Sequence, residues 1–210
     1  MKSIFTALFL IFGFSALAQE SDSIPRKQIH ISRIEESPKI DGKLNDPAWK
    51  NAAIATNFVE RLPNNGRPIP DSLATTVKIV YDDLGIYFGA EMLDPSPSEI
   101  RKELTERDGI GNDDFFFILL NGYNDRQQSM QFIVTAAGVQ YDAKMTNGFE
   151  DSSWNAIWDS AGKINDAGYV VEMKIPLNQL RFPAGLEQQT WGMDLIRYYP
   201  RSKRHRLSNN

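Results

Sequence analysis

The 210-residue chain contains no cysteine and only two histidines. The absence of cysteine excludes disulfide bonds, zinc-thiolate sites, cysteine nucleophiles and a lipid anchor on an N-terminal cysteine. The histidines, His30 and His205, lie near the two ends, and neither a G-x-S-x-G nor an H-E-x-x-H motif occurs. We therefore predict no catalytic residue and no zinc site, and a fold held together by burial alone.

Long hydrophobic runs are also scarce. The single one, IFTALFLIFGFSAL (4–17), follows Lys2 and ends in Ala16-Leu17-Ala18, a small-x-small cleavage pattern. This arrangement predicts that residues 1–18 are a secretory signal that is removed. The run is shorter than the roughly 20 residues that a membrane-spanning helix needs, and no later run is as long, so the mature chain is not expected to be transmembrane.

Basic residues do not dominate the remainder. Removing the signal with Lys2 leaves 22 basic and 27 acidic residues, which argues against a nucleic-acid partner. Residues 19–28 are polar and contain a proline, and they read as a flexible leader. We expect one domain over residues 29–200, followed by a basic tail (201–210) with no closing strand, so that the chain can be one piece of a longer protein.

Alternating apolar residues and frequent turn signals predict an all-β fold. Residues 77–81 and 86–92 form one expected hairpin, and residues 129–136 and 139–145 form another around Ala137-Gly138. FFFILL (115–120) is expected to be a strand covered on both faces. Further expected elements are strands at 169–175 and 191–199, a two-turn helix after Asp46-Pro47 that carries Trp49, and a helical turn at 177–181. These elements predict an antiparallel β-sandwich.

The order of seven segments resembles the family 9 carbohydrate-binding module. It is more closely similar to the copy found at the N-terminus of large exported bacterial proteins with a predicted C-terminal outer-membrane β-barrel. The segments are KIDGKLNDPAWKNA, VKIVYDDLGIYFGAEMLD, RDGIGNDDFFFILLNGYND, QFIVTAAGVQYDAK, DSSWNAIWDSAG, YVVEMKIPLNQLRFP and WGMDLIRYYPR. The resemblance implies a jelly-roll β-sandwich that binds the ends of glycan chains between aromatic side chains, and in some members a structural calcium ion.

Two tryptophans in DSSWNAIWDSAG are candidate ligand-binding residues. In an extended segment Trp154 and Trp158 share a face, about 13 Å apart at 3.3 Å per residue. They could form a platform on which successive sugar units stack, or one or both could fill the core. Arg107, Asp142 and Asn147 are further candidates for ligand contact.

The loop RDGIGNDDFFF (107–117) supplies the candidate metal ligands. If it is not extended, Asp108, Asn112 and Asp114 offer the hard oxygen atoms that calcium prefers. The alternative is a solvated acidic loop that discourages edge pairing. No haem site is predicted, since the methionines with strand spacing are expected in the core; they are Met92, Met130, Met145 and Met173.

Together these features predict an exported, non-catalytic carbohydrate-binding module whose partner is a glycan and which is linked to carbohydrate catabolism. The expected location is the periplasm, the outer membrane surface or the extracellular space. An alternative is a structural or assembly domain of a cell-envelope protein, attached to a membrane barrel that this chain does not contain. A weaker alternative is an activity associated with hydrolysis of O-glycosyl bonds, which needs two carboxylates across a cleft.

Overall fold

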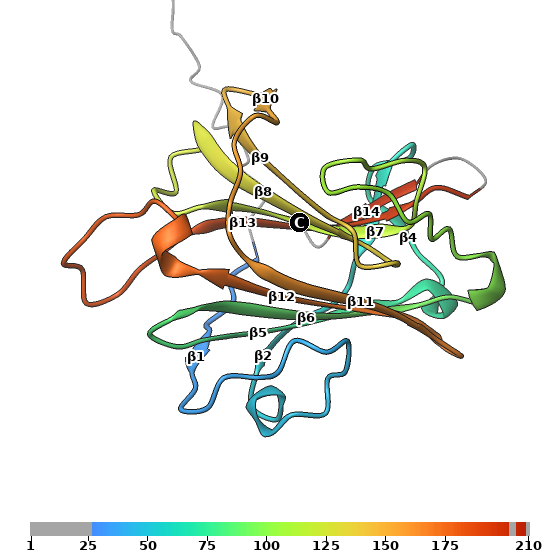
Figure 1. Ribbon diagram of the computed structural model, residues 1–210, viewed down its shortest axis with the longest axis horizontal. Coiled ribbons are helices and arrows are strands. Elements are labelled where there is room, and N and C mark those ends of the chain that lie inside the picture. The colour runs from blue at the N-terminus through green and yellow to red at the C-terminus, as the bar shows by residue number, and fades with distance from the viewer. Residues whose placement is uncertain (1–26, 202–204, 209–210) are drawn as a thin grey trace, which may run out of the picture.

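The computed structural model describes residues 27–201 and 205–208, and these form two β-sheets stacked face to face (Figure 1). Sheet A has the strand order β1-β5-β6-β12-β11, and β2 also pairs with β5. Its strands are β1 (Ser32–Arg33), β2 (Ala53–Ala55), β5 (Thr75–Tyr81), β6 (Gly85–Leu93), β11 (Asp159–Asn165) and β12 (Gly168–Pro176).

Sheet B has the order β10-β9-β8-β7-β13-β14-β3-β4. Its strands are β3 (Val59–Leu62), β4 (Arg67–Pro68), β7 (Phe115–Asn121), β8 (Gln128–Thr135), β9 (Gln140–Thr146), β10 (Phe149–Asp151), β13 (Gly192–Tyr199) and β14 (His205–Ser208). Apart from the parallel β1–β5 pair, the pairings are antiparallel. The predicted antiparallel β-sandwich and both predicted hairpins, now β5–β6 and β8–β9, are confirmed.

The described helices are single 3₁₀ turns: η1 (Pro47–Trp49), η2 (Asp71–Leu73), η3 (Pro97–Glu99) and η4 (Leu177–Gln179). The turn predicted at 177–181 is η4. Within the described residues, no helix has the length and apolar character that crossing a membrane requires. The predicted signal, residues 1–18, lies outside the described residues.

Period-two alternation explains the core. On β6, Phe88, Ala90 and Met92 belong to the central cluster between the sheets, whereas Tyr87 points to the opposite face of sheet A and packs there with Trp49 and Val80. The segment that carries Trp49 lies across this outer face, on the far side of sheet A from sheet B (Figure 1). Each full burial of such a side chain stabilises the fold by roughly 1.5–3 kcal/mol.

A buried glutamate on the outer face of β12 fixes this segment. Glu172 accepts hydrogen bonds from the backbone N–H groups of Asp41, Gly42 and Lys43 at 2.9, 2.7 and 3.2 Å, and from Nε1 of Trp49 at 3.3 Å. Gly42 has φ of +79°, which suits the sharp turn. The D-G…D-P-A-W pattern is therefore structural.

The predicted two-turn helix after Pro47 is wrong in length. Only η1 forms, and the Asp46 side chain makes no capping hydrogen bond. The reason is tertiary: the chain must become extended by Ala53 so that β2 can pair with β5, and this leaves room for one turn.

Two other expectations are corrected. On β7, Phe116, Ile118 and Leu120 are buried, but Phe115 and Phe117 on the opposite face remain half-buried, so the strand is covered on one face rather than on both. The tail also adds a strand, because β14 pairs with β13 and with β3. Of its two partners, β13 directly precedes it in the sequence, whereas β3 lies more than 140 positions earlier.

The two sheets approach closely where β11 passes the β8–β9 turn, and this contact positions the site described below. A Cβ atom on Gly162 would lie 2.5 Å from the carbonyl oxygen of Thr135 and 2.6 Å from the backbone nitrogen of Gly138. Because both atoms belong to the backbone, only glycine permits this approach. It brings Ser160 of β11 next to Gln140 of β9.

Candidate functional site

The centre of the candidate site is the buried carboxylate of Asp142, on β9. Its side chain has no exposed surface. It accepts hydrogen bonds from the backbone N–H of Ala156 at 2.7 Å and from Nε1 of Trp158 at 3.0 Å, and it forms an ion pair with Arg107. Three donors, two from residues 156–158 and one from Arg107, therefore satisfy one buried charge, as a buried charge requires.

Arg107 connects this carboxylate to the surface. Its guanidinium group also donates to the side-chain oxygen of Gln140 at 2.5 Å and to the carbonyl oxygen of Ala156 at 2.8 Å. Its Nε atom lies 3.8 Å from a carboxylate oxygen of Asp108. With 39% of its side chain exposed, Arg107 is held in a fixed orientation yet reaches solvent.

Gln140, which the sequence patterns did not single out, organises the neighbouring surface. Its amide nitrogen donates to the carbonyl oxygen of Trp158 at 3.1 Å and to Oγ of Ser160 at 3.0 Å. The oxygen and the nitrogen of this side-chain amide thus both have hydrogen-bond partners, and the side chain links β9 to β11. No local signal marks it, since a glutamine at the start of a strand is common on any solvated edge.

A shallow groove of about 370 Å³ lies beside Arg107. Its polar lining comes from Thr105, Arg107, Gln140 and Ser160, and Leu104 adds an exposed apolar side chain. The backbone of the β8–β9 turn, residues 137–139, forms another wall. The groove therefore offers hydrogen-bonding groups and apolar surface together, as ligand sites do.

Trp158 does not present a stacking face. It is 5% exposed, and its ring packs edge-on against Phe132 with the centroids 5.2 Å apart. Of the two predicted possibilities, core residue or platform, the core position is correct for this tryptophan. The physical reason is that the N–H group of its indole ring satisfies the buried Asp142.

Trp154 is only partly buried. Its ring also packs edge-on against Phe132, at 5.9 Å, and part of it remains accessible. The two indoles thus contact the same core phenylalanine and do not form an open two-ring platform. Trp154 is the one of the pair that has surface available to a ligand.

Asn147 is not part of this cluster. It occupies the β9–β10 turn with φ of +50°, a position that the Asn-Gly sequence explains. Five residues along an extended strand separate it from Asp142, roughly 16 Å at 3.3 Å per residue. A ligand beside Arg107 would reach it only by extending along β9.

The three predicted calcium ligands do not converge. Asp108 accepts a hydrogen bond from the backbone of Asp142 and lies beside Arg107, whereas Asp114 is fully buried and accepts from Arg101 and Arg201. The backbone carbonyl oxygen of Asn112 accepts a hydrogen bond from the guanidinium group of Arg101. Across the described residues no group of three or more His, Cys, Asp or Glu side chains is placed to hold a metal ion.

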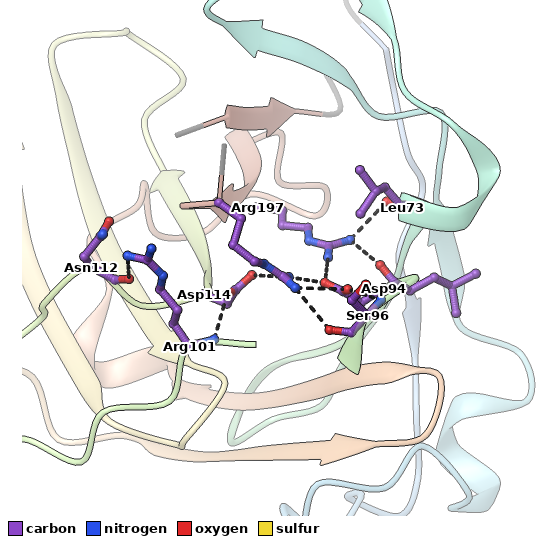
Figure 2. A network of polar contacts seen from close by, with 9 residues as sticks. Leu73, Asp94, Ser96, Arg101, Asn112, Asp114 and Arg197 are labelled. Atoms are coloured by element: carbon purple, nitrogen blue, oxygen red, sulfur yellow. Dashed lines mark hydrogen bonds and ion pairs between the residues drawn. The ribbon is translucent and has the colours of Figure 1, made fainter. Parts of the chain in front are cut away.

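Asp114 instead belongs to a buried network between the sheets (Figure 2). Arg201 pairs with both Asp94 and Asp114, and Arg197 donates to the carbonyl oxygens of Leu73 and Leu93 at 3.0 and 2.9 Å. Burial raises the pKa of the Asp114 carboxyl, while the Arg101 N–H group and the charge of Arg201 act in the opposite direction. This network stabilises the fold and does not reach the groove.

Comparison with known proteins agrees with this architecture. Three solved structures share the fold. Two are structures of a carbohydrate binding module family 9 from Caldicellulosiruptor kristjanssonii. The structure in complex with cellotriose has a TM-score of 0.51 and 19% identity, and the match covers 87% of this chain and 83% of that one. The structure in complex with glucose has a TM-score of 0.50 and 18% identity, and the match covers 85% of this chain and 84% of that one. The third is a putative carbohydrate-binding protein from Bacteroides uniformis, with a TM-score of 0.62 and 12% identity over 85% and 87%.

Sequence comparison identifies the family. Endo-1,4-beta-xylanase C of Paenibacillus barcinonensis is 28% identical over 167 residues, which are 79% of this chain and 14% of the xylanase. The chain therefore matches only a small part of that relative. A model of the family described as "Carbohydrate family 9 binding domain-like" matches residues 40–206, nearly all of the sandwich. The chain belongs to the carbohydrate family 9 binding domain-like family.

Proposed function

We propose that this non-catalytic carbohydrate-binding module holds its sugar in the groove beside Arg107. The observation that carries the proposal is the fixed pair of Arg107 and Gln140 at the wall of that groove. Asp142, Ala156 and Gln140 take three of the five N–H groups of this guanidinium group, and the two that remain, on Nη1 and Nε, are the donors that the proposal gives to sugar hydroxyl groups. Because Asp142 already holds the guanidinium in place, little side-chain entropy is lost on binding.

The proposal also gives a stacking role to Trp154, which is partly buried and lies beyond the residues that line the groove. This tryptophan lies two residues from Ala156, whose carbonyl oxygen accepts from Arg107. Aromatic rings bury large areas at little cost in conformational entropy, and sugar rings present C–H groups on their flat faces. The exposed Leu104 lines the same groove and adds apolar contact.

Isothermal titration against glucose, cellotriose and xylotriose tests the proposal. We expect binding by the wild type and a roughly tenfold weaker affinity for Trp154→Ala and for Thr105→Ala together with Ser160→Ala. The matched control is Tyr123→Ala, an exposed aromatic residue in the β7–β8 turn, which should bind as the wild type does. Absence of heat with every sugar at millimolar concentration contradicts the proposal. Repeating the titration with calcium or with a chelator measures whether a calcium ion bound elsewhere contributes.

The wider role is also a proposal. The signal-like residues 1–18 support export, and the partial match to a xylanase supports attachment to carbohydrate catabolism, with hydrolysis of O-glycosyl bonds carried out by another domain or protein. Attachment to a membrane barrel rests on the sequence resemblance. Immunodetection in fractionated cells of the source organism, with antibodies against the sandwich, would locate the full-length product and give its size.

A further inference from the structure

The C-terminal strand β14 holds the β3–β4 hairpin to the rest of sheet B. In the sheet order β14 lies between β13 and β3, and β4 forms the edge. Among the described strands, β3 pairs with β14 and β4, and β4 pairs with β3 alone. β14 and β4 lie at the same side of the molecule (Figure 1). If β14 left the sheet, the hairpin would therefore lose its strand pairing with the sandwich.

This part of sheet B buries little apolar surface. Leu207 of β14, 2% exposed, is its contribution to the core among the side chains that the structure describes there. The exposed residues of the hairpin strands are Arg61, Leu62, Arg67 and Pro68. The strands β6 and β12, by contrast, bury nearly all of their residues. The register of β14 with β3 is also irregular between Arg206 and Leu207. Few buried contacts place these strands at the low end of local stability.

Buried groups fix the chain just outside these strands. Phe58, directly before β3, is 4% exposed. Shortly after β4, the carbonyl oxygen of Leu73 accepts a 3.0 Å hydrogen bond from Arg197, which has no exposed side-chain surface (Figure 2). Shortly before β14, Arg201 pairs with the buried Asp94. The points at which the hairpin and β14 leave the body are therefore held independently of the pairing beyond them.

We infer that β3, β4 and β14 form a flap that opens as one unit while the rest of the sandwich, its body, stays folded. Opening breaks the β13–β14 pairing and exposes the backbone edge of β13 at residues 196–199. The contacts of Arg197 and Arg201 mark the boundary between flap and body. The inference goes beyond the proposed function, because the Arg107 groove lies at the other part of sheet B, where β9 and the β8–β9 turn form its wall.

Native-state hydrogen exchange, followed by mass spectrometry in urea below the unfolding transition, tests the inference on the wild type. We expect the amides of the hairpin and of β14 to share one opening rate, at least about tenfold faster than that of β6 and β12. Their exchange should depend weakly on urea, because the opening exposes little surface. Flap amides with the rate and the urea dependence of the body overturn the inference.

Two core variants separate opening of the flap from unfolding of the whole protein. Val171→Ala, at a fully buried position of β12, weakens contacts that the open flap leaves intact. It should accelerate exchange in the body about tenfold but change flap exchange less than twofold. Leu207→Ala should accelerate exchange in the hairpin and in β14 by the same factor, about tenfold. Acceleration of the flap by Val171→Ala as large as that of the body, or of β14 alone by Leu207→Ala, contradicts a single flap.

A disulfide that locks β14 provides an independent readout. Because the chain has no cysteine, Tyr198→Cys with Arg206→Cys, directly opposed in the β13–β14 register, forms an unambiguous bridge. The oxidised form should exchange about tenfold more slowly than the reduced form, in the hairpin as well as in β14. The matched control is Phe117→Cys with Ile133→Cys, opposed in the β7–β8 pair of the body, whose oxidation should leave flap exchange unchanged. A hairpin that exchanges equally fast in the oxidised and the reduced lock opens without β14, which overturns the inference.

Discussion

Nε1 of Trp158 donates a 3.0 Å hydrogen bond to Oδ2 of Asp142, a carboxylate without exposed surface. Arg107 pairs with the same carboxylate from the solvent side. The tryptophan that sequence patterns offer as a sugar platform is therefore an internal support for the arginine that lines the groove. One buried carboxylate thus contacts both a core tryptophan and the arginine that lines the proposed sugar groove, and this predicts how variants of Asp142 behave.

Replacing Asp142 by alanine should destabilise the protein by about 3 kcal/mol. The change leaves the N–H groups of Trp158 and Ala156 without an acceptor and Arg107 without its partner, and each loss of a buried partner costs about 1–3 kcal/mol. Urea unfolding followed by tryptophan fluorescence measures the effect. Asp166→Ala, in the exposed β11–β12 turn, should stay within about 0.5 kcal/mol of the wild type. A small loss for Asp142→Ala would show that water replaces it easily.

The two tryptophans should respond differently to truncation. Trp158→Ala removes a ring that is 5% exposed and should cost about 3–5 kcal/mol, as large-to-small core changes do. Trp154→Ala should cost less stability but reduce sugar affinity, since its ring is partly accessible. Denaturant unfolding and titration of each variant separate the effects. Equal stability losses at the two positions would argue that Trp154 is also a core residue.

The network between the sheets should tolerate the loss of Asp94 poorly. Asp94→Ala leaves Arg197, which has no exposed side-chain surface, and Arg201 short of a counter-charge, and breaking such a buried pair costs about 3–5 kcal/mol. The matched comparison is Asp83→Ala, which breaks the exposed pair with Arg33 and should cost less than about 1 kcal/mol. Chemical denaturation of both variants decides the point. Similar values for the two would mean that Asp94 does not hold the sheets together.

Acid stability should depend on Asp82. Burial by itself raises the pKa of this carboxyl, but hydrogen bonds from Ser37, Tyr87 and the N–H groups of Leu84 and Gly85 together outweigh burial and place the pKa below its ordinary value of 3.8. A group with a lowered folded-state pKa contributes stability above its unfolded pKa and loses that contribution as the pH falls through the folded pKa.

The test is the change in unfolding midpoint between pH 6 and pH 2.5. Asp82→Asn should be less stable than the wild type at pH 6 and should lose less stability on acidification, because its side chain binds no proton in either state. Asp83→Asn, at the exposed neighbouring position, serves as the control and should follow the wild type. An acid-induced loss of the same size in all three proteins would contradict the assignment.

Local patterns were sufficient for most strands and for the hairpins. Val77 and Ile79 on β5 flank Lys78, and the turn at Asp82–Gly85 follows soon after, so their partners Ala90 and Phe88 lie only 13 and 9 positions away (90 − 77 and 88 − 79). The same patterns failed at Pro47, where pairing of β2 with a distant strand limited the helix, and at β14, which pairs with its neighbour β13 and with the remote β3. The failure at Pro47 reflects a non-local contact, whereas the basic sequence after Pro200 carries no alternation that marks β14 as a strand.

The sequence by itself determined that the chain folds as an antiparallel β-sandwich, because side-chain alternation and turn residues act over a few positions. It also indicated Arg107 and Asp142 as polar candidates. Only the tertiary structure decided that these two pair, that Gln140 joins them at a groove, that Trp158 is internal and that Asp114 pairs with Arg201. The partners are 16 to 87 positions apart along the chain. A period-two pattern indicates which face of a strand a residue occupies, but not which distant segment covers that face.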